Sequence, residues 1–144
     1  MINKITKDLI NNKCWRIGRS YGSMLVLDFG NKISYTSPRT GINYKGEWIL
    51  IVKTANWILK QNNIQISTGE SEKEFIDKNI TLIEDKSLLD IIDSTSGTNF
   101  IFQDNIVLEI PKDSDMEEYD LYRPDKYVLT VGPDHKILHK DSTK

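Results

Sequence analysis

Cysteine is the scarcest reactive residue in this chain, with Cys14 as the only one among 144 residues. A single cysteine excludes a disulfide within the chain and suits a reducing compartment. The sequence also lacks an apolar run of the roughly 20 residues needed to cross a bilayer. Its first residues lack the continuous apolar segment of a signal peptide. We therefore expect a cytoplasmic protein that does not engage a membrane.

An excess of charge of one sign is missing as well. The chain has 19 basic and 21 acidic residues, for a formal net charge of −2. Nucleic-acid-binding proteins usually carry a marked basic excess, so this balance argues against a nucleic-acid partner. Hydrophobic content of 38% and charged content of 28% are instead typical of globular proteins. Because 144 residues are enough for one core, we expect a single domain over residues 1–144.

The usual catalytic and metal-binding signatures are also absent. No P-loop, dinucleotide-binding or hydrolase motif is found. His135 and His139 lie in a strand-like pattern, which separates them by about 13 Å and makes them exposed edge residues rather than ligands of one ion. The stretch 113–117 begins like a calcium loop, but Glu118 stands where glycine is required and Pro124 where a bidentate glutamate is required. The sequence therefore predicts no metal and no cofactor.

Cys14 is the remaining candidate for covalent chemistry. It stands beside Trp15, and neither histidine is near it in the sequence. A cysteine nucleophile needs a neighbour that lowers its pKa, whereas buried cysteines behave as small apolar residues. We interpret Cys14 as a structural thiol and predict no catalytic residue.

What the sequence does contain is alternation of apolar and polar residues, the pattern of β-strands. The run 23–29 alternates clearly, and 48–52 is apolar on both faces, which indicates a central strand. Two helices are predicted, one short and N-terminal and one near residues 71–81. The second begins with Ser71-Glu72-Lys73-Glu74, a capping-box pattern. The fold class is therefore mainly β, with antiparallel strands and two helices.

The strand pattern is repeated along the chain. The matching segments are 22–28 and 97–103, 47–51 and 118–122, and 57–59 and 127–129. We predict two pseudo-repeated β-meanders, residues 13–68 and 87–140, joined by the helix near 71–81 and packed around one core. Chance alternation in two β-rich segments is the alternative. The predicted core residues are Leu25, Leu27, Leu50, Phe100, Phe102, Leu121 and Leu129.

Two groups of charged residues are candidates for a partner-binding surface. They are an acidic group, Asp113, Asp115, Glu117, Glu118 and Asp120, and an arginine group, Arg16, Arg19 and Arg39. The acidic group would attract a basic surface and speed association. The arginines would hold an acidic partner. The alternatives are a solvated acidic loop that aids solubility and ordinary surface charge.

Two other kinds of site stay open. A small-ligand pocket between the two halves would be lined by Glu47, Trp48, Trp57, Tyr119 and Tyr127, although tryptophans in strands belong to the core by default. An enzyme of unrecognised type would use Glu47 and Glu118 as an acid/base pair. That role requires the two carboxylates to lie within about 10 Å of each other.

The first half of the chain carries a distinctive pattern. It reads Trp15-x-Ile17-x-Arg19-x-x-Gly22-Ser23-x-Leu25-x-x-x-Phe29-Gly30, then Gly46-Glu47-Trp48-x-Leu50 and Trp57-x-Leu59. This pattern resembles a family of small, uncharacterised bacterial proteins, which implies a bacterial cytoplasmic protein and no catalytic residues. Size, acidity and β-content are also similar in kind to immunity proteins that neutralise bacterial toxins. We therefore expect a non-catalytic module whose partner is another protein.

Overall fold

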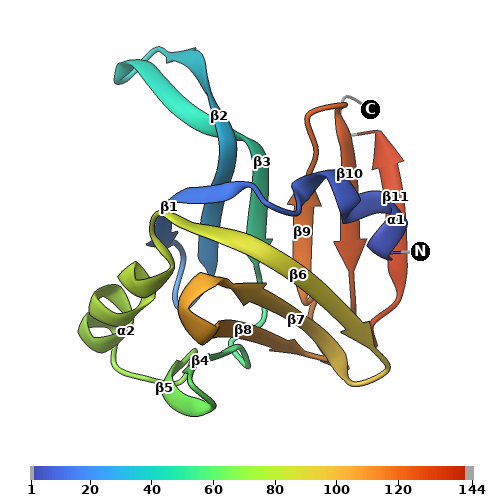
Figure 1. The fold of residues 1–144 in the computed structure, drawn as a ribbon. Coiled ribbons are helices and arrows are strands. Elements are labelled where there is room, and N and C mark those ends of the chain that lie inside the picture. The colour runs from blue at the N-terminus through green and yellow to red at the C-terminus, as the bar shows by residue number, and fades with distance from the viewer. Residues whose placement is uncertain (1, 142–144) are drawn as a thin grey trace.

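The computed structural model describes residues 2–141, and these form a mainly antiparallel β-structure (Figure 1). The strands are β1 (Lys13–Arg19), β2 (Leu25–Ser37), β3 (Gly41–Val52), β4 (Ile58–Gln61), β5 (Ile64–Thr68), β6 (Lys86–Ser94), β7 (Gly97–Phe102), β8 (Ile106–Pro111), β9 (Tyr119–Tyr122), β10 (Tyr127–Val131) and β11 (Ile137–Asp141). Their order in the sheet is β11-β10-β9-β3-β2-β1-β6-β7-β8-β4-β5. The helices are α1 (Ile2–Thr6) and α2 (Lys73–Asn79), with short 3-10 turns at Lys7–Leu9, Ile80–Ile83 and Gln103–Asn105.

Alternation within the strands places apolar side chains in cross-strand rows. On one side of the core, Leu27 faces Leu50 in the neighbouring strand, and Leu50 faces Leu121. Leu121 in turn faces Leu129 in β10. All four leucines are fully buried. Such pairs on one face of a sheet contribute most of its packing energy, which explains why the alternating pattern folds in this register.

A second row lies on the other side of the core and closes it. Phe100 of β7 faces Ile91 and Leu108 in the strands that flank it. Aromatic rings join the two sides: Phe29 stacks on Phe102 with centroids 6.2 Å apart, and Phe100 meets Tyr119 edge-on at 5.5 Å. All seven predicted core residues are buried in this common core, as the sequence predicted.

The predicted division into two separate meanders differs from the observed strand pairing. β4, from the first half, pairs with β8 of the second, and β9, from the second half, pairs with β3 of the first. The matched segments 47–51 and 118–122 are hydrogen-bonded neighbours, with Ile49 opposite Tyr122, rather than equivalent strands of two units. The halves exchange strands because each edge strand gains a full hydrogen-bonded partner in the other half. The duplication itself stays a prediction.

The connecting helix forms where it was predicted, but its capping differs. α2 spans Lys73–Asn79 and continues into a 3-10 turn, with Ile76 and Ile80 buried beneath it. Glu72 occupies the N-cap position and makes no side-chain capping bond. Ser71 Oγ instead accepts a hydrogen bond from the backbone N–H of Thr68 at 3.0 Å. The serine therefore stabilises the turn before the helix, and the capping box is not formed.

Cys14 lies in β1 and is fully buried. Burial raises the pKa of its thiol to about 12, so almost no thiolate is present at neutral pH. We expect the folded protein to resist labelling by a thiol-specific reagent in mildly alkaline buffer, and the denatured protein to take up one equivalent. Rapid labelling of the folded protein, measured by mass spectrometry, would contradict the structural assignment of this residue.

Candidate functional site

β2 and β3 continue beyond the rest of the sheet as a two-stranded extension, residues 31–46, which we call the projecting hairpin (Figure 1). β1 pairs with β2 only over Leu25–Phe29, and β9 pairs with β3 only over Ile49–Val52. Within the described chain, residues 2–141, no other strand pairs with either edge of the hairpin. The hairpin is therefore exposed on both faces and along both edges.

The base of the projecting hairpin is braced on one side by a buried carboxylate. Asp28 is almost fully buried and accepts hydrogen bonds from Gly46 N at 2.8 Å and Arg16 Nε at 2.9 Å. Arg16 also donates from Nη2 to the carbonyl oxygen of Tyr44 at 2.9 Å. These side chains satisfy backbone groups of β3 where a bulge in β2 interrupts the pairing.

A second contact braces the other side of the bulge. Glu47 Oε1 accepts a hydrogen bond from Asn31 N at 3.1 Å. Gly30, next to it, has φ of +78°, a conformation that favours glycine. The bulge therefore has a defined geometry, and the hairpin leaves the sheet in one direction rather than swinging freely.

The surface of the projecting hairpin combines cations with exposed apolar side chains. The cations are Lys32, Arg39 and Lys45, and no acidic residue occurs between residues 31 and 46. The exposed apolar side chains are Ile33, Tyr35, Ile42 and Tyr44. Lys32 lies over the Trp15 ring at 4.8 Å and Lys45 over the Tyr35 ring at 5.8 Å. Among the carboxylates whose side chains are described, within residues 2–139, none forms an ion pair with these three cations.

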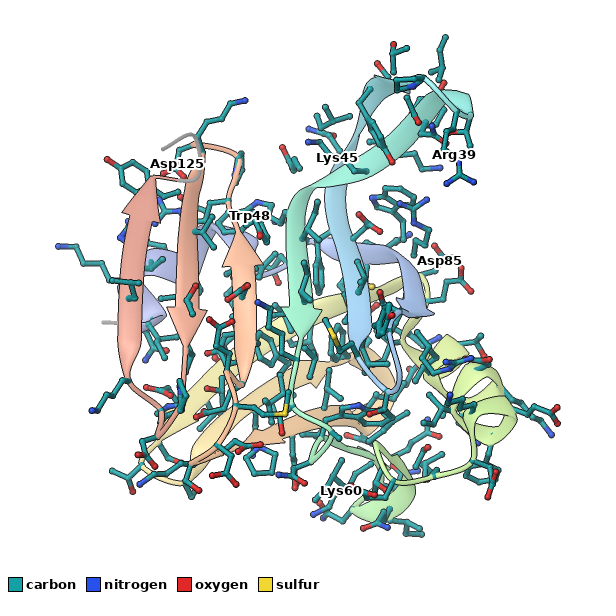
Figure 2. The ribbon with its side chains drawn as sticks, turned by 180° about the vertical axis from the view of Figure 1, so that it is seen from behind. Arg39, Lys45, Trp48, Lys60, Asp85 and Asp125 are labelled. Atoms are coloured by element: carbon teal, nitrogen blue, oxygen red, sulfur yellow. The ribbon has the colours of Figure 1, made fainter. Side chains whose placement is uncertain are left out.

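A cleft of about 470 Å³ separates the projecting hairpin from the β9–β10 turn. Its lining residues are Ile33, Lys45, Gly46, Glu47 and Ile49 on the hairpin side and Tyr122, Arg123, Pro124 and Lys126 on the turn side. Figure 2 shows Lys45 on the hairpin and Asp125 on the turn across from it. Arg123 is held by Asp125 and lies near His139, so the turn wall is ordered by its own contacts.

The aromatic pocket predicted between the two halves does not come together. Trp57 and Tyr119 are buried in the core, where Trp57 Nε1 donates to the Ser23 carbonyl oxygen at 2.8 Å. Tyr127 is partly exposed and packs against the ring of His139, 4.9 Å away. Of the five predicted pocket residues, only Glu47 and Trp48 lie together at one hollow, which is beside the β9–β10 turn. Trp57 and Tyr119 lie in the core because their burial removes large apolar surfaces from water.

The acidic stretch 113–120 does not form the exposed acidic surface that the sequence predicts. Glu118 is fully buried, and Asp113 and Asp120 are buried as well. Lys53 lies 2.7 Å from Glu117 and 2.8 Å from Asp120 and pairs with both. Asp115 is exposed.

Asp113 is held by a set of hydrogen bonds of its own. Thr54 Oγ1 donates to Asp113 Oδ2 at 2.6 Å, and the backbone N–H groups of Asp115 and Met116 donate to Oδ1. These bonds, led by the one from Thr54, lower the pKa of Asp113. Most carboxylates of the acidic stretch therefore make contacts inside the molecule that stabilise the loop before β9, because buried carboxylates require partners.

Two of the three predicted arginines are also used inside the molecule. Arg16 braces the hairpin base through Asp28, and Arg19 pairs with Asp77 of α2 at 2.7 Å. Arg39 is exposed on the projecting hairpin, as expected for a residue that meets a partner. Sequence reasoning missed Lys32 and Lys45, which belong to the same hairpin and lie on its two opposite faces. The signal that identifies them is the absence of any carboxylate between Asp28 and Glu47.

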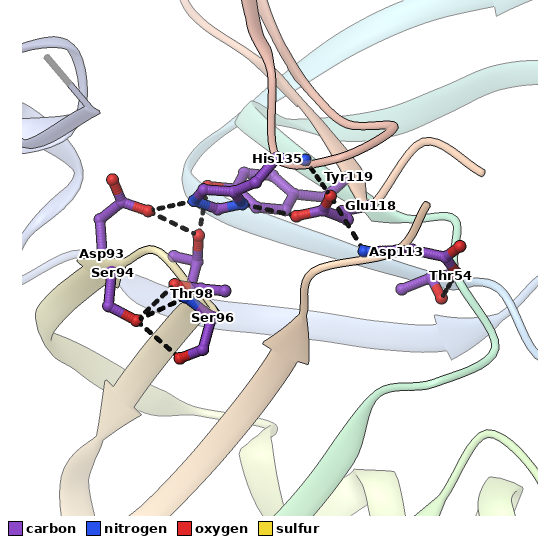
Figure 3. A network of polar contacts seen from close by, with 10 residues as sticks. Thr54, Asp93, Ser94, Ser96, Thr98, Asp113, Glu118, Tyr119 and His135 are labelled. Atoms are coloured by element: carbon purple, nitrogen blue, oxygen red, sulfur yellow. Dashed lines mark hydrogen bonds and ion pairs between the residues drawn. The ribbon is translucent and has the colours of Figure 1, made fainter. Parts of the chain in front are cut away.

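A second cluster of polar residues joins three loops around His135 (Figure 3). His135 Nδ1 lies 2.6 Å from Glu118 Oε1, and its Nε2 lies 2.6 Å from Asp93 Oδ1. The backbone N–H of His135 donates to Glu118 Oε2 at 2.7 Å. Thr98 Oγ1 donates to Asp93 Oδ1 at 3.2 Å and lies 3.0 Å from the Tyr119 hydroxyl. His135 is therefore an internal cross-link, and the expectation of an exposed edge residue is wrong.

The contacts of this cluster do not leave His135 free to act as a general base. Burial alone lowers the pKa of His135, but hydrogen bonds to Glu118 and Asp93, together with their negative charges, outweigh it and raise the pKa. With a carboxylate at each ring nitrogen, the imidazolium donates both of its protons internally. It has no free nitrogen to accept a proton from a substrate, which a general base requires.

The acid/base pair of Glu47 and Glu118 is not assembled either. The backbone N–H of Lys53 donates to the carbonyl oxygen of Glu118, which places Glu118 beside the C-terminal end of β3. Glu47 lies near the start of the sheet-bound part of β3, about 20 Å away along the strand. The two carboxylates therefore cannot act on one bond.

Three further findings bear on function. Within residues 2–141, no group of three or more His, Cys, Asp or Glu side chains is placed to hold a metal ion. No helix of the described chain is both long enough and apolar enough to cross a membrane. No family model matches the chain, and no curated protein or solved structure matches it. Function is therefore inferred from the geometry of the projecting hairpin and the cleft beside it.

Proposed function

We propose that this protein is a non-catalytic binding protein that holds an acidic protein partner on its projecting hairpin. The observation that carries the proposal is the set of cations on the hairpin, Lys32, Arg39 and Lys45, which lie beside exposed apolar side chains and form no ion pair with the described carboxylates of residues 2–139. Other cations of the described chain, such as Arg19 and Lys53, do form ion pairs with carboxylates. Unpaired cations beside exposed apolar side chains favour binding to a surface of opposite charge.

The composition of the hairpin favours a protein over a nucleic acid. Tyrosine and arginine are enriched at protein interfaces, and the hairpin carries Tyr35 on one face, Tyr44 on the other and Arg39 in the turn between its strands. Ile33 and Ile42 add aliphatic surface, which fits apolar side chains of a partner. A nucleic acid is usually held by a longer basic track, and the whole chain has a net charge of −2.

The mode of action follows from the missing catalytic set. The hairpin is exposed and braced, and both ring nitrogens of His135 contact carboxylates of the same chain. We therefore propose that the protein acts by covering its partner's surface. We propose that it does so as immunity proteins do when they neutralise toxins, which is the role that its sequence resembles in kind. The bacterial and cytoplasmic setting remains a prediction from the sequence.

The proposal predicts which peptides the protein selects from a random display library. We expect the enriched peptides to be acidic and to bind K32E/R39E/K45E at least about tenfold more weakly than the wild type, because like charges then face each other. The matched control, K7E/K73E/K136E, makes the same charge change at exposed positions outside the hairpin and should bind as the wild type does. Affinity is measured by fluorescence anisotropy with labelled peptides.

Two results would count against this function. Peptides that bind the hairpin variant and the wild type equally would remove the hairpin as the binding element. Tight, hairpin-dependent binding of single-stranded oligonucleotides, with no selection of acidic peptides, would replace the protein partner by a nucleic acid.

A further inference from the structure

The sheet has an unoccupied strand position beside β3. β2 pairs with one edge of β3 along the whole hairpin, from Ser37 opposite Gly41 to Leu25 opposite Val52. On the other edge β9 covers only Ile49–Val52. In line with β9, along residues 41–48 of β3, no strand of the described chain is present. The cleft described above lies at this position.

β9 stops short for a local reason. After Tyr122 the chain turns at once, with Arg123 N donating to the Tyr127 carbonyl oxygen at 3.0 Å and Lys126 N to the Arg123 carbonyl oxygen at 3.3 Å. Pro124 sits inside this turn and has no N–H to offer to a neighbouring strand. The chain itself therefore cannot extend β9 alongside the projecting hairpin.

The backbone of β3 presents hydrogen-bonding groups to the open position. Gly46 N and the Tyr44 carbonyl oxygen are directed toward the β2 side, where Asp28 and Arg16 bind them. Along a strand the N–H and C=O of one residue point to the same edge, and the edge alternates from residue to residue. The groups of Asn43, Lys45 and Glu47 therefore point to the open edge.

We infer that an extended acidic segment of the partner adds to β3 as a strand at residues 41–47, in line with β9. This inference rests on the proposed function and specifies how the partner is held. Main-chain hydrogen bonds to Asn43, Lys45 and Glu47 supply the pairing, as in strand addition to an exposed sheet edge. Lys45 and Glu47 lie two residues apart on one face of β3 and both line the cleft, so they meet alternate side chains of the added strand.

The charged residues that line the cleft are three cations, Lys45, Arg123 and Lys126, and one carboxylate, Glu47, so positive charge predominates and favours an acidic segment. Lys45 is exposed and lies over the Tyr35 ring, and none of the described carboxylates, within residues 2–139, forms an ion pair with it. Arg39 lies near the hairpin tip, and Figure 2 shows both cations on the hairpin. An acidic residue at alternate positions of the added strand places its carboxylate near Lys45, and cross-strand pairs of opposite charge are favourable.

The test uses a blocked peptide of alternating glutamate and valine, titrated into the isotope-labelled protein and followed by NMR. We expect the largest amide shifts at residues 43, 45 and 47, and slower amide exchange there, because these groups become hydrogen-bonded. Two N-methylated peptides are compared, one methylated at its odd residues and one at its even residues. One of them should not bind and the other should bind nearly as well as the unmethylated peptide, since only one set of N–H groups faces β3.

A pair of protein variants isolates the backbone contribution. Asn43→Pro removes an N–H at the open edge without removing a bond to β2, and should weaken peptide binding about fivefold, the value of a typical hydrogen bond. Asn43→Ala removes the side chain and retains the N–H, so it should bind within about twofold of the wild type. The circular dichroism spectrum verifies that both variants fold.

The outcomes separate this inference from the proposed function. One outcome is binding that depends on Lys32, Arg39 and Lys45 and yet is weakened equally by N-methylation at odd and at even residues. That result overturns strand addition and leaves the acidic partner intact. Equal binding of a lysine–valine peptide overturns the acidic partner and leaves strand addition intact. No shift at residues 41–47 with either peptide at millimolar concentration overturns both.

Discussion

Replacing His135 by alanine should lower the free energy of unfolding by about 3–5 kcal/mol, the usual cost of breaking a buried charge pair. Glu118 is fully buried and would lose its contact with Nδ1, while Asp93 would lose its contact with Nε2. The remaining hydrogen bonds to Glu118, from the backbone N–H groups of Asp113 and His135, do not neutralise its charge. Urea denaturation monitored by tryptophan fluorescence measures the change.

The other histidine provides the matched control. His139 is partly exposed, lies near Arg123 Nη1 and packs against Tyr127, and none of the described carboxylates, within residues 2–139, contacts it. His139→Ala should therefore cost no more than about 1 kcal/mol, as substitutions outside buried networks do. If both variants lose the same stability, the charge cluster is not what distinguishes His135.

The cluster also gives the stability a defined dependence on pH. The pKa of His135 is raised in the folded protein, so the folded state binds more protons than the unfolded state between the two pKa values. The contribution of His135 is therefore complete below its unfolded pKa of about 6.5 and is lost as the pH rises through the folded pKa. The difference in unfolding free energy between the wild type and His135→Ala should shrink over that window. A difference that grows with pH would contradict the charged clamp.

Leu50→Ala should cost about 2–5 kcal/mol, because it leaves a cavity in the middle of a row of buried leucines. Leu50 is fully buried and is flanked by Leu27 on β2 and Leu121 on β9. Neither neighbour can move into the space without breaking its own backbone pairing. Thermal or urea unfolding measures the loss.

Two control substitutions make the Leu50 result specific. Leu50→Met nearly conserves volume and should cost less than about 1.5 kcal/mol. Ile49→Ala, on the opposite face of β3 beside the cleft, removes a half-buried side chain and should cost less than Leu50→Ala does. A loss under about half a kcal/mol for Leu50→Ala would show that the shared core is not packed around this residue.

Local structure and core membership could be predicted from the order of the residues. The alternation in 23–29 and 48–52 identified two strands that the fold contains, and all seven predicted core residues are buried. The helix near 71–81 was found as well. These features are readable because the side-chain period of a strand or helix is a property of neighbouring residues, and burial of the apolar face follows from it.

Strand pairing and the neutralisation of charges inside the molecule depend on long-range contacts, which the sequence does not reveal. The exchange of β4 and β9 between the halves joins segments about fifty residues apart or more, which no local period records. Glu118 and Asp113 look like surface acids until His135 and Thr54 are brought to them by the fold. Lys32 and Lys45 look ordinary until the pairing leaves them without carboxylate partners in the described chain on a hairpin that projects from the sheet. A charge is identified as available to a partner only when the long-range contacts have shown which other charges are already neutralised.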